Sequence, residues 1–160
     1  PYLKFAAMIG TSMIAMYGLM YLNTYIIDHV FFSETRAWMA LYMGGAMAVV
    51  MLAFMLGMYS NKTLNLAIFI GAAAAFALGL WLVRSQNTIE DVAWMKAIIP
   101  HHSIAILTSE RADLSDPRVR ALADGIIEVQ RAEIAEMKNY INDIQANGDA
   151  PPGTERDKVE

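Results

Sequence analysis

Two stretches without a charged side chain decide the fold. Residues 38–59 read WMALYMGGAMAVVMLAFMLGMY, and residues 64–83 read LNLAIFIGAAAAFALGLWLV. A helix needs about 20 apolar residues to cross the hydrocarbon core of a bilayer, so each stretch is long enough to span a membrane. Only residues 60–63 separate them, and this short link predicts a tight antiparallel hairpin of two transmembrane helices.

A third uncharged run begins near residue 5 and is expected to reach about residue 27. It is longer than the apolar region of a typical signal peptide, and two further spans follow, so it is interpreted as a transmembrane helix rather than a cleaved leader. Aromatic side chains near the ends of the runs are typical of the membrane–water interface: Tyr25, Trp38, Tyr59 and Trp81. A stripe of small residues on the third span predicts close approach of another helix: Gly71, Ala75 and Gly79.

Charge divides the chain into two parts. Residues 1–87 hold six charged side chains with a net charge of +2, whereas residues 88–160 hold 14 acidic and 8 basic side chains with a net charge of −6. This division predicts a three-helix transmembrane domain over 1–87, a helical domain in water over 88–147, and a disordered polar tail over 148–160. The acidic balance argues against a nucleic-acid partner, and the absence of cysteine excludes disulfides and thiolate metal ligands.

Methionines recur along the second span at roughly one-turn spacing: Met39, Met43, Met47, Met51, Met55 and Met58. Thioethers suit a soft metal such as Cu(I), so the stripe is consistent with a metal path. Methionine is also an adaptable apolar filler, and packing is the interpretation that we favour.

Two helices are predicted after the spans. Thr88 and Asp91 resemble a capping box for a helix that runs to about residue 112, and Pro100 predicts a kink in it. Asp116 and Pro117 are a strong start signal for a second helix. Its apolar stripe runs to about residue 144, and Gly148 is expected to end it.

Such a hairpin buries little core by itself. We therefore expect an all-α fold in which the long kinked hairpin pairs with that of a second copy to form a four-helix bundle. Packing onto the membrane spans is the alternative.

Several polar and thioether side chains on the two helices could surround a metal ion. His101, His102, Glu133 and Met137 are the candidate ligands, with Gln130, Asp91 and Met95 in support. Neighbouring residues of a helix point about 100° apart, so one of the two histidines is expected to bind the ion and the other to serve a partner chain or an outer layer.

The structural interpretation of these residues is a histidine held by a hydrogen bond at the hairpin seam, with Glu133 paired to Lys96 or Arg131. In the first loop, His29 beside Asp28 is expected at the surface, although it could approach the hairpin.

The sequence between residues 95 and 106, MKAIIPHHSIAI, resembles the M-x-x-M-I-P-H-H-x-x-A-I signature of the DUF305 family. Residues 116–137 resemble the second half of the same family, with Asp116-Pro117, Gln130, Glu133-Ile134 and Met137 in order. The resemblance implies a ferritin-like helical bundle outside the cytoplasm, with copper-binding metal-resistance proteins among the relatives. Many members carry a methionine about six residues after the double histidine. Leu107 and Thr108 stand there in this chain, and this departure puts the Cu(I) preference in doubt.

Together these features predict a membrane-anchored, homodimeric metal-binding protein that handles copper, or alternatively zinc, and is not an enzyme. A di-iron oxidase would need Glu-x-x-His pairs, and the chain has none. The competing hypothesis is a membrane assembly module without a metal. The basic residues are evenly divided between the two sides, and we expect a bacterial plasma membrane protein with its C-terminal domain in the periplasm.

Overall fold

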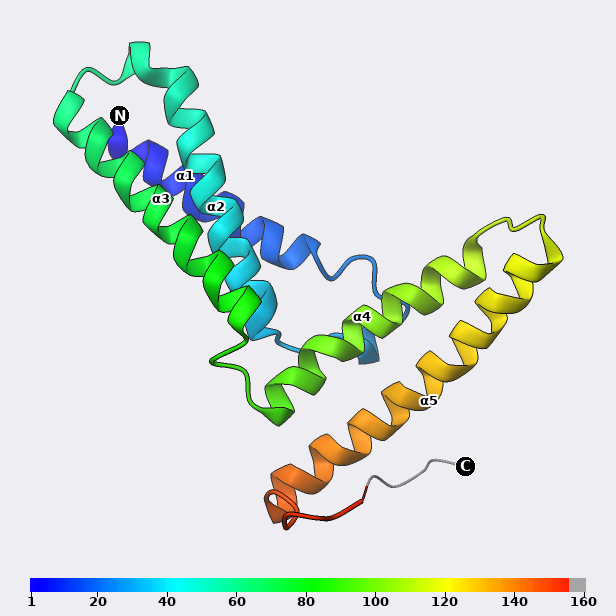
Figure 1. The fold of residues 1–160 in the computed structure, drawn as a ribbon. Coiled ribbons are helices and arrows are strands. Elements are labelled where there is room, and N and C mark those ends of the chain that lie inside the picture. The colour runs from blue at the N-terminus through cyan, green and yellow to red at the C-terminus, as the bar shows by residue number, and fades with distance from the viewer. Residues whose placement is uncertain (156–160) are drawn as a thin grey trace. The chain divides into compact units, whose positions relative to one another are not determined.

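The computed structural model describes residues 1–155 and shows an all-α chain over that range, which confirms the predicted class. Its elements in order are α1 (Tyr2–Leu19), η1 (Ile27–His29), α2 (Glu34–Met55), η2 (Leu56–Met58), α3 (Lys62–Ser85), α4 (Asp91–Arg111) and α5 (Pro117–Asn147), as Figure 1 shows. They form two compact units. The first unit contains Pro1–Leu22 and Glu34–Ile89, and the second contains Asn23–Ser33 and the chain from Glu90 onward.

Three helices of the first unit are long and apolar enough to cross a membrane: Tyr2–Leu19, Glu34–Met58 and Lys62–Ser85. The first span is shorter than predicted, because α1 ends at Leu19 rather than near residue 27. Arg36 lies at this end, where its guanidinium donates to the Met20 carbonyl and stacks 4.3 Å from the centre of the Tyr21 ring. A cation that bonds the last carbonyls of a helix stabilises its C-terminus.

α2 and α3 pack closely because glycines lie where their backbones meet. A Cβ on Gly79 would lie 2.9 Å from the Tyr42 backbone nitrogen, and one on Gly45 would lie 2.7 Å from the Ala72 carbonyl oxygen. The predicted small-residue stripe is therefore correct at Gly79. It is wrong at Gly71, where an added Cβ would meet nothing within 4 Å.

Two of the four predicted interfacial aromatics make contacts within the protein. Tyr59 is buried against Phe5 and Tyr2, and Tyr25 packs on the core of the second unit. The methionine stripe has two environments as well: Met51 and Met55 contact the core of the first unit, whereas Met43 and Met58 are exposed.

In the second unit, α4 and α5 run side by side in opposite directions (Figure 1). Their shared core consists of Met95, Ile99, Ile106, Ile134, Met137 and Ile141. α4 is one continuous helix through the buried Pro100, so the proline does not interrupt it. A proline removes a single backbone donor, and the turns on either side keep theirs.

The predicted capping box is wrong. Glu90 is the N-cap residue of α4 and makes no side-chain cap, and the Thr88 hydroxyl instead accepts a bond of 3.3 Å from the Trp38 indole nitrogen. The start of α5 is as predicted: the Asp116 carboxylate accepts from the Arg118 backbone nitrogen at 2.8 Å, and Pro117 occupies the first helical position. α5 ends at Gly148, whose φ is 81°. Of the predicted tail, residues 148–155 form no helix, and the rest lies outside the described residues.

Candidate functional site

A pocket of about 600 Å³ opens between α4 and α5. It is lined from α4 by Trp94, Met95, Ile98 and His102, and from α5 by Glu133, Glu136, Met137 and Tyr140. Every lining residue belongs to the second unit. The pocket therefore lies within one compact part of the chain, where helical spacing decides which side chains can meet.

The His102 imidazole and the Glu133 carboxylate form the polar centre of this pocket. His102 Nε2 lies 2.7 Å from Glu133 Oε2, and the two side chains are 20% and 37% exposed. Met95 lies seven residues before His102 and Met137 lies four residues after Glu133, so each thioether shares a helix face with one of the polar groups. One imidazole, two thioethers and the carboxylates of Glu133 and Glu136 thus line the same pocket.

The other three predicted site residues do not line it. His101 points from the exposed side of α4, as the 100° step between neighbouring helical residues requires. Asp91 shares the helix face of His102, but eleven residues at 1.5 Å each put it roughly 16 Å away along the axis. Gln130 is partly exposed, one turn before Glu133.

The expected partners of Glu133 are also not the ones observed. Arg131 forms an ion pair with Glu110, and Glu133 contacts His102 rather than Lys96.

Sequence reasoning missed four lining residues: Trp94, Ile98, Glu136 and Tyr140. Glu136 is notable because it is only 7% exposed although it is a carboxylate. A buried acid is costly unless it is paired. Its spacing of three residues from Glu133 was the available signal, since such residues share a helix face.

Within residues 1–155, no group of three or more histidine and acidic side chains is close enough together to hold a metal ion. Besides His102 and Glu133, the donors that line the pocket are the thioethers of Met95 and Met137 and the carboxylate of Glu136. Such a donor set suits a soft or borderline ion better than a hard one.

The segment Asn23–Ser33 belongs to the second unit and brings His29 to α4. His29 Nδ1 lies 2.9 Å from the Ser103 hydroxyl, which also accepts a 2.7 Å bond from the Tyr25 backbone nitrogen. Asp28 forms an ion pair with Lys138 of α5. His29 is 8% exposed, so the expectation of a surface histidine is wrong.

The surroundings of this loop shift two ionisable groups. Burial lowers the pKa of His29, and the nearby ammonium of Lys138 lowers it further. The same ammonium, through its hydrogen bond, lowers the pKa of Asp28. His29 is therefore held in its neutral form at a lower pH than an exposed histidine would be.

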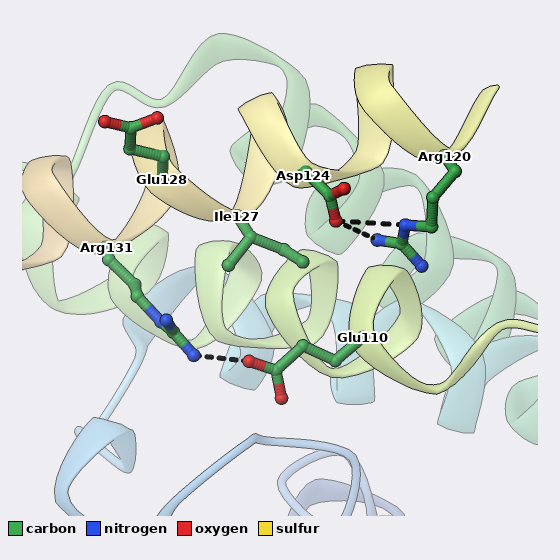
Figure 2. Close-up of a pocket in the computed structure, with 6 residues that line it drawn as sticks. All are labelled: Glu110, Arg120, Asp124, Ile127, Glu128 and Arg131. Atoms are coloured by element: carbon green, nitrogen blue, oxygen red, sulfur yellow. Dashed lines mark hydrogen bonds and ion pairs between the residues drawn. The ribbon is translucent and has the colours of Figure 1, made fainter. Parts of the chain in front are cut away.

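A second pocket, drawn in Figure 2, holds charged side chains on both sides of Ile127. Arg131 reaches Glu110 on α4, and Arg120 pairs with Asp124 at 2.7 Å within α5. These pairs are solvent-exposed, and exposed ion pairs contribute on the order of 0–1 kcal/mol to stability. These side chains form a charged face on this part of the hairpin.

The fold and the pocket define a class: a helical protein with three candidate membrane spans and a helix pair that carries a mainly apolar pocket with a histidine–glutamate centre. Residues 82–157 match the family model described as "Domain of unknown function (DUF305)", which supports the family resemblance for this part of the chain.

A curated relative is similar over part of the same chain. The "Uncharacterized protein L153" of Acanthamoeba polyphaga mimivirus is 36% identical over 66 residues, which cover 40% of this chain and 43% of that protein. No solved structure matches the chain.

Proposed function

We propose that this chain is a membrane-anchored metal-binding protein whose ion is held between α4 and α5 by His102, Glu133, Met95 and Met137. The observation that carries the proposal is the shared pocket, which these four side chains line from two helices and in which the His102 imidazole lies 2.7 Å from the Glu133 carboxylate. The family resemblance to copper-binding relatives is in accord with it, as an analogy.

Copper is the first choice of ion and zinc the second. Two thioethers and one imidazole favour Cu(I), whereas an imidazole and carboxylates alone would favour Zn(II). Metal ligands must lose their protons to bind, so the affinity should fall as the pH is lowered. In this proposal the spans hold the pocket at the periplasmic surface of a bacterial plasma membrane, and the protein performs no chemical reaction.

The two adjacent histidines provide a matched pair of variants. We expect His102→Ala to weaken Cu(I) binding by at least about tenfold, because the loss of a mere hydrogen-bond partner of a ligand typically already costs about 10–100-fold in metal affinity. His101→Ala, one residue away and exposed, should bind as the wild type does. The measurement is a competition titration of the purified full chain in detergent with a Cu(I) chelator, repeated with Zn(II). Equal affinities for the wild type and the His102→Ala variant would contradict the proposal.

The second candidate function is an assembly module without a metal. The observation that favours it is the His102–Glu133 contact itself, because each group already satisfies the other in the absence of an ion. This alternative predicts that the protein as isolated contains no stoichiometric metal and that strong chelators leave its melting temperature unchanged. Metal binding to the folded state would instead raise that temperature with metal concentration.

A further inference from the structure

The N-terminal half of α5 exposes a row of large apolar side chains on one side. The row consists of Val119, Leu122, Ile126 and Val129, of which Leu122 is 64% and Val129 53% exposed. Their spacings of three, four and three residues put them on a single helix face. A soluble domain rarely leaves such a continuous row in water, and rows of this kind mark interaction surfaces.

This row continues into the mouth of the pocket. Glu133 and Tyr140 follow Ile126 at intervals of seven residues, so they extend the same face of α5. On α4, the half-exposed Trp94 lines the pocket beside them. We call this side of the helix pair the open face.

The opposite side of the helix pair is covered by the chain's own loop. Ser103 lies nine residues after Trp94, which is half a revolution of α4, and it bonds to Tyr25 and His29 of the loop. Lys138 lies nine residues after Val129 and pairs with Asp28. The unit therefore has one covered side and one open face.

We infer that a second copy of this chain covers the open face and closes the pocket over His102 and Glu133. A copy fits because the row is complementary to itself when reversed. With a two-fold axis between Gly125 and Ile126, Leu122 of one copy lies opposite Val129 of the other. The same reversal brings Arg118, which pairs with Asp116 of its own chain and is 90% exposed, toward Glu133 of the other copy. A parallel arrangement would not bring these unlike charges together.

The membrane favours this pairing. Anchored copies meet at a high effective concentration, so a modest apolar contact is enough to hold them together. A helix pair of this size also buries more apolar surface when it packs against a second pair, as in a four-helix bundle.

Closure would change the pocket as well as the surface. A partner over its mouth removes water from the His102–Glu133 contact and strengthens the electrostatic interactions inside. This part of the inference rests on the proposed function, whereas the pairing of copies does not. The metal affinity of the pocket should accordingly depend on dimerisation.

The chain contains no cysteine, so single cysteines report cleanly on the interface. In the full chain reconstituted in lipid vesicles, Ile126→Cys should form an intermolecular disulfide under mild oxidation. Glu128→Cys is the matched control, since it is exposed, lies two residues further along and points from the opposite side of α5. Efficient cross-linking at residue 126 and little at residue 128 is expected. Equal cross-linking of the two variants would overturn the dimer. That result is expected if a lipid surface or another protein covers the open face.

The link to the pocket is tested with two further variants. Leu122→Asp should convert the detergent-solubilised dimer to a monomer in light scattering and weaken Cu(I) binding by at least tenfold. Ala121→Asp, an exposed neighbour on another side of α5, should change neither. Unchanged Cu(I) affinity in a Leu122→Asp monomer would overturn closure of the pocket. If the wild-type dimer binds no metal, the proposed function fails while the interface stands.

Discussion

Adjacent residues of one helix can lie in different surroundings, and His101 and His102 are an example. The 100° step between them leaves His101 exposed and turns His102 into the pocket against Glu133. Because of the same step, the sequence predicts that only one of the two histidines belongs to the site. It does not show which one. The choice depends on where α5 lies against α4, and local spacing contains no information about that.

Glycine positions in the first unit differ in a similar way, and they give a prediction. Gly79→Ala would place a methyl group 2.9 Å from the backbone of Tyr42 in α2, so the two helices must move apart. We expect a loss of about 1–3 kcal/mol in the free energy of unfolding, as for other overpacked cores. The measurement is denaturant unfolding of the full chain in detergent.

Gly71→Ala is the matched control, because it adds the same methyl group to the same helix in open space. It should be neutral or slightly stabilising, since alanine favours helix more than glycine does. Similar losses in both variants would show that the close approach at Gly79 is not the cause.

Among the elements, the segment Asn23–Ser33 departs furthest from its sequence-based interpretation. The sequence predicts that it continues the first span and then forms a surface loop. It instead packs on α4 and α5 through hydrogen bonds at Ser103 and the ion pair between Asp28 and Lys138. These bonds join residues more than 70 positions apart, so no pattern within the segment could reveal them.

This loop should make stability depend on pH. The pKa of His29 is lower in the folded chain than its ordinary value of 6.5, because burial and Lys138 disfavour the imidazolium. Between the two pKa values the unfolded chain binds more protons than the folded chain, so stability rises with pH in that window. The stability contributed by keeping His29 neutral is complete above pH 6.5, and it is lost progressively as the pH falls below that value.

The measurement is the free energy of unfolding of the full chain in detergent between pH 5 and 8. His29→Gln keeps a polar side chain and removes the titration, so its stability should change less over this range than that of the wild type. Identical pH profiles would exclude His29 as the source. Asp28, whose pKa is lowered from 3.8, titrates well below this window and does not confuse the comparison.

For the whole molecule, three spans require that the first loop and the C-terminal helices lie on the same side of the membrane. The structure adds that both belong to one compact unit. A membrane-impermeant maleimide applied to sealed vesicles should therefore label Ile27→Cys and Ala121→Cys from the same side. Ser60→Cys, in the link between α2 and α3, should be labelled from the other side. Labelling of Ile27→Cys and Ser60→Cys from one side would contradict three spans.

The sequence by itself determined the three apolar helices, the antiparallel helix pair, and the start and end of α5 at Asp116 and Gly148. These features depend on apolar length, periodicity and end residues, which act over a few turns of the chain. Tertiary structure decided what depends on distant packing: the glycines at which α2 and α3 meet, the burial of His29 against Ser103, and the presence of Glu136 in the pocket. The same packing selects His102 over His101, because the pocket exists only where α5 lies against α4.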